Sequence, residues 1–512
     1  MVRIIKAVGD LPSVGYVLAW DSAYVSEALK AADVPHSEIY LDKIVQVRLP
    51  LPAIGLEAHS VLMNEGLARL HPGADGSYFA NGQERLQRLY FSGLREILEQ
   101  PRDYVRVFNT VGLIEPMLRG EVVLADIIGF AALMVKAPRV YQLIRREPRW
   151  FVGPLPGDLS LFKKPEEVLE AGATQRDAVF EECSHPAAVR KLVRHLFPLT
   201  VRADEISIGR VLEMEGHIAV PERLLVALQF HVSGGDVSLV MARRYLLQSG
   251  NRSEIAGSLT QENCLEFLER LGDIAEATGT AAIPDVDQLC TEIARLADVE
   301  PFSSRSRERS GFFQLRAEDI ALRAIEKIVA VAATGRGESI AENIVADPKA
   351  LTVGMVLFSI SYLGKKVEID GLRCRRSAKV DLEKQLAKSM VEAARAGELL
   401  ATCNPGYILM RLSVAVPNVC RSAFDEMKAA DSTLDGFALA MFKAGLDSNK
   451  GQYYSLPDDR SLVEAYCSLE ELREHARCRM LDPALELPAR AAWQAVVEEK
   501  GIYGIDGSYV RD

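Results

Sequence analysis

The stretch Val14-Gly-Tyr-Val-Leu-Ala-Trp-Asp21 decides the N-terminal fold, because it is a short apolar run that ends in an acidic residue. A run of this kind, bounded by turn residues, is typical of a strand buried on both faces of a parallel sheet. Residues 22–31 then follow a helical pattern, and Ile44-Val-Gln-Val-Arg-Leu49 alternates as a second strand, which the prolines after it stop. The sequence therefore predicts a small α/β unit with a partial parallel sheet over residues 1–55.

Helical periodicity dominates from residue 56 onward, where apolar residues recur at intervals of three and four. The predicted fold class is thus mainly α: a small α/β remnant at the N-terminus, then a long helical region. Composition divides the helical part into residues 56–160, 161–300 and 311–512. The segment Pro301–Ser310, rich in Ser and Arg, is the best candidate for a linker between the last two.

Composition limits the classes of function. The 512 residues are 48% hydrophobic and 26% charged, as in an ordinary globular chain of several domains. A net charge of −11 argues against nucleic-acid binding over a wide surface, because phosphate neutralisation needs clustered Lys and Arg. The cysteines and histidines are dispersed, which predicts reduced thiols and no metal site. No apolar stretch is long enough for a signal peptide or a membrane span, so we expect a cytoplasmic protein.

Several further strings occur in a fixed order along the chain. Tyr40-Leu-Asp-Lys-Ile-Val-Gln46 runs into Arg48-Leu-Pro-Leu-Pro52, and Pro101-Arg-Asp-Tyr-Val-Arg106 follows, with Val123–Ile128, Pro138–Tyr141 and Leu196-Phe-Pro198 further on. Together with Tyr16–Asp21, these strings resemble the KAP family of P-loop NTPases, a branch of the STAND class, over residues 1–290. The resemblance implies that residues 1–55 are the C-terminal part of the NTPase core, 56–160 a helical lid and 161–300 a helical family region. Residues 311–512 form a helical domain of unknown role.

A P-loop NTPase needs the string G-x-x-x-x-G-K-[ST], whose backbone amides, lysine and hydroxyl hold phosphate and magnesium. The sequence contains no such string. In the family, this Walker A segment and the acidic Walker B strand both precede the strand that reads Tyr16–Asp21 here. The resemblance therefore implies that these segments lie upstream, in a separate polypeptide, or have been lost. We expect ATP and Mg²⁺ to bind only if such a segment completes the site, and the chain alone not to hydrolyse ATP.

Three candidate site residues lie in the predicted α/β unit. Asp21 ends the first predicted strand, where an aspartate caps the following helix, serves as a sensor as the resemblance implies, or binds metal directly. Lys43 and Gln46 stand at the start of the second predicted strand. Lys43 either meets the nucleotide or is a solvated edge lysine, and Gln46 is expected to line the cleft or contact the lid.

Arg102 and Arg106 are four residues apart and so lie on one face of a predicted helix. Two guanidinium groups there are able to stabilise the charge of a bound triphosphate, as arginine sensors do. The alternative is a solvated basic face whose arginines pair with Asp103 or Glu115. Without a phosphate-binding loop, neither arginine has a nucleotide to sense in this chain.

The leading hypothesis is a partial KAP-type NTPase, which the resemblance links to nucleotide-dependent switching and, in bacteria, to defence against phage. The alternative is a non-enzymatic helical interaction protein that has lost nucleotide chemistry, and a third, weaker class is nucleic-acid binding through a helical tail. The expected partner is a separate polypeptide that carries the phosphate-binding loop, or a second copy of the chain. We expect neither a nucleic-acid nor a membrane partner.

Overall fold

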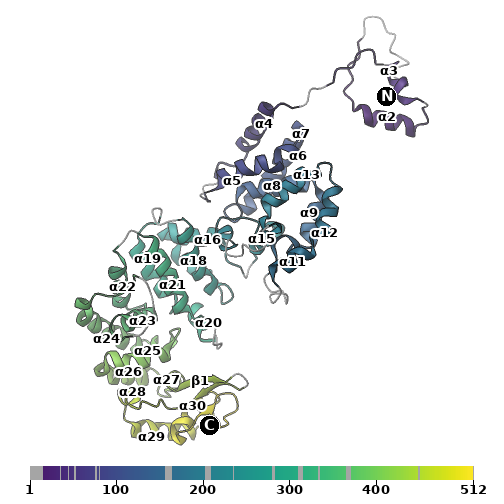
Figure 1. Ribbon diagram of the computed structural model, residues 1–512. Coiled ribbons are helices and arrows are strands. Elements are labelled where there is room, and N and C mark those ends of the chain that lie inside the picture. Colours follow the sequence, from purple (N-terminus) through teal and green to yellow (C-terminus); the bar gives the residue numbers. More distant parts are fainter. Residues whose placement is uncertain are drawn as a thin grey trace. The chain divides into compact units, whose positions relative to one another are not determined.

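The computed structural model describes residues 15–34, 36–43, 45–50, 54–74, 78–79, 81–155, 164–201, 209–233, 236–278, 283–308, 315–332, 335–364, 371–447 and 450–510. The chain divides into two compact units, Met1–Asn64 and Glu65–Asp512 (Figure 1). It is mostly helical, which confirms the predicted mainly α fold class.

Between residues 15 and 50, the described part of the first unit forms the short helices α2 (Ser22–Ala31) and α3 (Ser37–Asp42). Helix α2 is the one that the sequence pattern predicts. It begins after Asp21, whose carboxylate accepts hydrogen bonds from the backbone N–H groups of Ala23 at 2.9 Å and Tyr24 at 3.1 Å. These bonds satisfy amides that have no partner inside the helix, and this explains where α2 starts.

The prediction of two N-terminal strands is wrong for the residues that the structure describes. Residues 15–20 and 45–50 form no strand. Their apolar side chains are exposed rather than buried on both faces, with Val17 99% and Leu49 87% exposed. A strand pattern becomes a strand only when a neighbouring strand accepts its backbone hydrogen bonds, and the described part of this unit supplies none. The helix-like pattern at residues 2–11 lies outside the described residues.

The helices that follow the first unit lead from its boundary into the second unit. Helix α4 crosses that boundary. These helices are α4 (Leu56–Ala68), α5 (Gly82–Leu89), α6 (Arg95–Ile97), α7 (Pro101–Leu118), α8 (Leu124–Lys136), α9 (Pro138–Arg146) and α10 (Arg149–Val152), with the 3₁₀ turn η1 (Pro72–Ala74) and the π-helical segment η2 (Tyr90–Leu94).

Helix α7 shows how local sequence sets these boundaries. Pro101 occupies its first position, where the missing N–H has no helical partner to lose. The Asp103 carboxylate accepts a hydrogen bond from the Gln100 N–H at 3.2 Å and completes a capping box. Proline also opens α9, so α8 ends at Lys136, two residues before Pro138, and the chain bends by 114° between the two helices.

The remaining helices of the second unit continue in the same manner, and several begin with proline. They are α11 (Pro165–Ala171), α12 (Ala173–Glu181), α13 (Pro186–Leu196), α14 (Gly209–Met214), α15 (Pro221–Gln229), α16 (Leu239–Leu247), α17 (Arg252–Gly257), α18 (Cys264–Thr278), α19 (Val286–Leu296), α20 (Phe302–Glu308), α21 (Ala317–Val331), α22 (Gly337–Ala346), α23 (Leu351–Tyr362), α24 (Lys379–Arg395), α25 (Pro405–Ala415), α26 (Pro417–Ala430), α27 (Asp435–Met441), α28 (Ser461–Glu464), α29 (Leu469–Met480) and α30 (Ala489–Glu498). Short turns are η4 (Pro198–Thr200), η6 (Ser249–Asn251), η8 (Arg376–Ala378) and η9 (Leu399–Ala401).

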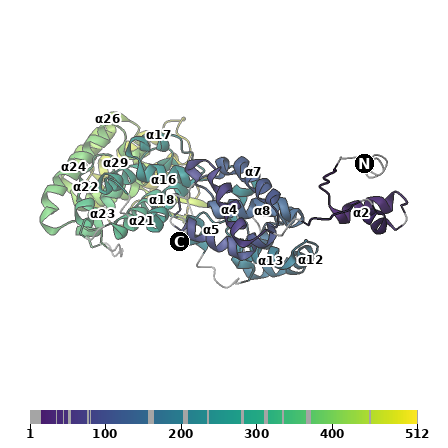
Figure 2. The same ribbon diagram turned by 90° about the horizontal axis from the view of Figure 1, so that it is seen from above.

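A large hydrophobic core joins the later helices of the second unit. One cluster of buried side chains extends from Phe79 to Ile502. Helix α23, which carries no charged residue, is buried over most of its length, and α22 and α24 pack beside it, as both ribbon views show (Figures 1 and 2). A helix that is apolar all round must be covered on every side, and this explains its central place.

The predicted linker at residues 301–310 is wrong in its described part. Residues 302–308 form α20, and Phe302, Ser303 and Ser306 are buried. The Ser306 hydroxyl accepts a hydrogen bond from the Ala317 N–H at 3.1 Å, which ties α20 to the start of α21. A composition rich in Ser and Arg fits both a solvated loop and a short helix whose serines contact a neighbouring helix. The contact between helices decides between the two, and local sequence does not contain it.

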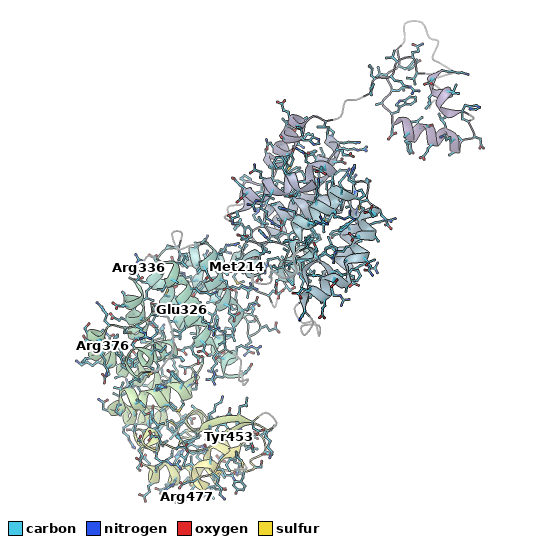
Figure 3. The ribbon with its side chains drawn as sticks, viewed as in Figure 1. Met214, Glu326, Arg336, Arg376, Tyr453 and Arg477 are labelled. Carbon is cyan, nitrogen blue, oxygen red and sulfur yellow. The ribbon has the colours of Figure 1, made fainter. Side chains whose placement is uncertain are left out.

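The sheet in the described part of the chain lies near the C-terminus and is antiparallel, in the order β1-β2-β3. Its strands are β1 (Lys443–Asp447), β2 (Gly451–Tyr454) and β3 (Ile502–Tyr503). Tyr453, labelled in Figure 3, packs edge-on against Tyr503 with ring centres 6.1 Å apart. We expected only helices in this region, because strands this short carry too little alternation to be recognised.

Within the described residues, no single helix is both long and apolar enough to cross a membrane. The bent pair α8 and α9 meets the length and composition test only when the two helices are counted together.

Candidate functional site

Helix α7 places Arg102 and Arg106 on the same exposed face, one turn apart, as their spacing predicts. The opposite face of α7 is fixed by burial of Tyr104, Val107 and Phe108. Because that face is packed in the core, the two arginines are held toward solvent by the fold and not by contacts of their own.

Nearby carboxylates are already paired with other cations. Asp103 is 3% exposed and accepts a hydrogen bond from the Lys136 Nζ at 3.0 Å. Glu115 is also buried, and both of its oxygens accept hydrogen bonds from Arg119, each at 2.7 Å. The alternative interpretation, in which Arg102 and Arg106 pair with Asp103 or Glu115, is therefore wrong: these ion pairs do not form. In the described part of the chain, neither Arg102 nor Arg106 has a side-chain partner.

The electrostatics of this face favour an anion. Arg102 is the second residue of α7, beside the end of the helix that carries the positive partial charge of its dipole. A cation at that end is unfavourable by itself, and an anionic ligand removes the penalty. Asp103 offsets part of the positive charge from inside the helix, but it is committed to Lys136.

Further along the same face of α7 the exposed side chains are apolar. Val105, Leu113 and Met117 are exposed, Leu113 by 74%. We did not expect a functional role for these residues from the sequence. A helical projection of residues 101–118 contains the signal, because apolar residues appear there on both faces of the helix rather than on one.

The other candidate residues lie in the first unit. Asp21 caps α2, so the capping interpretation is confirmed, and a further sensor role stays a prediction. Lys43 follows the last residue of α3 and is exposed, and Gln46 is exposed at a bend rather than on a strand. Because Asp21, Lys43 and Gln46 belong to one unit and the two arginines to the other, a common site of all five residues stays a prediction.

Asp21, Lys43, Gln46 and both arginines fall within one segment that matches a family model. Residues 1–118 match the family model of the KAP family P-loop domain. The match confirms the resemblance and identifies this segment as NTPase-like in general terms. It ends at the last residue of α7, short of the residues 1–290 over which we expected the resemblance. No curated protein and no solved structure matches the chain.

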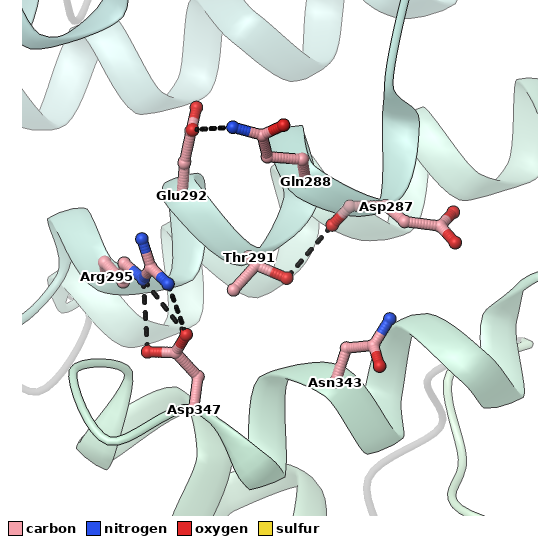
Figure 4. A pocket seen from close by; sticks show the side chains of 7 residues that line it. All are labelled: Asp287, Gln288, Thr291, Glu292, Arg295, Asn343 and Asp347. Carbon is pink, nitrogen blue, oxygen red and sulfur yellow. Dashed lines mark hydrogen bonds and ion pairs between the residues drawn. The ribbon is translucent and has the colours of Figure 1, made fainter.

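A polar pocket of about 250 Å³ lies outside the KAP segment, between α19 and α22 (Figure 4). Three of its charged side chains, Arg295, Asp347 and Glu292, are bonded within the protein. Arg295 donates hydrogen bonds at 2.5–3.1 Å to both carboxylate oxygens of Asp347. Glu292 accepts hydrogen bonds from Gln288 at 2.8 Å and from Arg252 at 2.7 Å. Together with Asp287, the pocket holds three carboxylates, which repel phosphate. It joins α19 to α22 and does not fit nucleotide chemistry.

Proposed function

We propose that this chain is part of a KAP-type, nucleotide-dependent switch in which Arg102 and Arg106 contact the terminal phosphates of ATP. The observation that carries the proposal is the pair of exposed, unpartnered guanidinium groups at the start of α7, inside the segment that matches the KAP family. These two guanidinium groups have no carboxylate partner among the described residues, although Asp103 and Glu115 lie on the same helix.

The proposed site needs a phosphate-binding loop. We propose that the partner of this chain is a separate polypeptide that supplies the loop, or a second copy of the chain. Asp21, Lys43 and Gln46 would then face the nucleotide and its Mg²⁺. Exposed apolar surface supports a partner. Fourteen of the twenty-four large apolar side chains that are exposed among the described residues lie within residues 15–118, less than a quarter of the chain. Nine of these side chains belong to the first unit, which thus exposes apolar surface of the kind that protein contacts cover.

A second candidate function is a helical interaction protein without nucleotide chemistry. The same concentration of exposed apolar residues favours it, because that surface binds a partner whether or not nucleotide is present. The two candidates differ in what Arg102 and Arg106 do. Use of the switch in defence against phage rests on the family resemblance alone and belongs to the first candidate.

Equilibrium binding of ATP to the purified chain tests the role of the arginines. We expect weak binding of MgATP and of inorganic tripolyphosphate, in the millimolar range or weaker, since two charge-assisted contacts supply only about 3–6 kcal/mol before the entropic cost of binding. The double variant Arg102→Gln/Arg106→Gln is expected to weaken binding of both probes by at least about tenfold. Binding should also fall with added salt.

The matched control is Arg145→Gln/Arg146→Gln. These arginines are exposed at the end of α9, have no ion pair among the described residues, and remove the same charge when replaced. We expect this control to bind both probes as the parent chain does. Equal loss in the two double variants would assign the binding to net charge, and no loss in either would favour the interaction protein.

A further inference from the structure

A buried ion pair in the second unit joins three segments that are distant in sequence. Asp126 of α8 has no exposed surface, and its carboxylate accepts hydrogen bonds from Arg85 of α5, Nε at 2.5 Å and Nη2 at 3.0 Å. The same carboxylate accepts a hydrogen bond at 2.9 Å from the N–H of Ile218, just before α15. Asp126 therefore holds α5 and the segment 215–220 together on α8.

Two histidines lie beside this ion pair. His195 is in the last turn of α13, and His217 precedes the bonded Ile218. His217 is 6% exposed. Its Nδ1 and the Nε2 of His195 are buried and have no hydrogen-bond partner among the described residues. The clustering of two partly unsatisfied imidazoles around one committed carboxylate is what sets this part of the core apart.

The charged groups around the histidines come from each packed element. Arg85 and Arg88 of α5 and Asp126 of α8 face His195, and Arg85, Asp126 and His195 face His217. Arg88 is paired with Glu84 on its own helix. Glu215 lies 3.3 Å from Nε2 of His217 and accepts a hydrogen bond from Asn81 at 2.8 Å. With both histidines neutral, the buried charges of Arg85 and Asp126 cancel.

We propose that Arg85, Asp126, His195 and His217 form an acid-operated latch: with neutral histidines it holds α13 and the segment 215–220 against α5 and α8, and protonation of the histidines releases them. Protonation adds two positive charges near Arg85, whereas the buried carboxylate of Asp126 is already bonded to Arg85 and to the Ile218 N–H. Glu215 offsets this for His217 only in part, because it is partly exposed. This inference is independent of the proposed nucleotide site.

The direction of the effect follows from the protonation equilibria. Burial, together with the charge of Arg85, lowers the pKa of both histidines from the ordinary 6.5 to about 4 in the closed state. In an open state the imidazoles take up protons near the ordinary value, so opening becomes more favourable as pH falls from 6.5 toward 4. Between pH 7.5 and pH 5.0 the opening equilibrium should rise about 30-fold for each histidine.

Amide hydrogen exchange of the full chain tests the latch. Protection factors, which correct for the intrinsic exchange rate, are compared at pH 7.5 and pH 5.0. We expect protection of α13 and of residues 215–220 to fall by about 30-fold or more at pH 5.0. Helix α23, which contains no Asp, Glu, His, Lys or Arg, should change far less. A uniform loss over both regions, or no loss at all, would overturn the proposal.

The variant His195→Gln/His217→Gln removes both titrating groups and should abolish the difference between the two pH values. If this variant does not fold, ¹³C-labelled histidine in the parent chain gives the second test. Two of the eight imidazole signals are then expected to titrate below pH 5, with assignment by the single variants. Midpoints above pH 6 for all eight histidines would show that the cluster is already open or solvated and would rule out the latch.

Discussion

Lys136 at the end of α8 donates a hydrogen bond across 3.0 Å to the buried carboxylate of Asp103 in the first turn of α7. This ion pair joins two helices that are adjacent in sequence but meet at their far ends. It also explains why Arg102 and Arg106 remain unpaired, because the acidic residue between them points inward and is already used. The basic face of α7 is therefore a consequence of how α8 packs.

Replacing Lys136 by Met should destabilise the second unit by about 1–3 kcal/mol, because Asp103 is then left buried without its cation. Chemical denaturation gives the free energy of unfolding directly. The control Arg145→Met removes an exposed arginine without an ion pair and should change stability by less than about 0.5 kcal/mol. Equal effects of the two substitutions would mean that the ion pair does not support the fold.

A pair of glycine substitutions tests how α4 meets α7. A Cβ atom at Gly66 would lie 2.2 Å from the ring of Phe108, so Gly66→Ala should destabilise the chain by about 1–3 kcal/mol through overpacking. A Cβ at Gly112 would meet no atom within 4 Å, and Gly112→Ala should stabilise α7 by up to about 1 kcal/mol. Opposite shifts in melting temperature are expected, and shifts of the same sign would contradict this packing.

Glu121 organises a second buried polar site. Its carboxylate accepts hydrogen bonds from Arg223 at 2.7 Å and from the N–H groups of Leu239 and Val240 at 2.9 and 3.0 Å, at the start of α16. Glu121→Gln leaves Arg223, which is 2% exposed, without its counter-charge and should cost about 3–5 kcal/mol.

A double-mutant cycle gives the test of this coupling. Arg223→Met in the Glu121→Gln background should restore part of the lost stability, because the uncompensated buried charge is then gone. Additive losses from the two substitutions would mean that Glu121 acts mainly through the α16 amides.

Hydrogen exchange should separate the two units of the chain. The described residues between 15 and 50 bury little apolar surface, whereas residues 104–136 lie mainly in the packed helices α7 and α8. We expect low protection over the first range and high protection over the second, measured at one pH on the isolated chain. High protection over both ranges in a monodisperse monomer would show that the first unit is closed by itself, and the need for a partner would be abandoned.

Purified chain should show no Mg²⁺-dependent ATP hydrolysis above buffer, because we expect no phosphate-binding loop within these residues. Release of inorganic phosphate is the measurement, and Arg106→Ala serves to exclude a contaminating ATPase. Turnover that survives repurification and falls in Arg106→Ala would show that the chain completes its own site.

Local sequence signals predicted part of the fold and of the site. The N-cap Asp21 and the helix after it, the helical period from residue 56, and the shared face of Arg102 and Arg106 were all readable from spacing, and the KAP strings were recognisable. Each depends on residues within one or two turns of one another, and for such features the chain itself supplies the physical constraint.

Only the tertiary structure decided the rest. The apolar runs that begin at Val14 and Ile44 look like strands, but in their described residues they form none, since a strand needs a partner that local sequence does not provide. Spacing gave Asp103 and Glu115 as possible partners of the arginines, yet Lys136 and Arg119 bind them. The sequence thus determined which residues share a helix face, whereas packing between helices determined which charges are satisfied, because burial and distance across elements fix the energy of an ion pair.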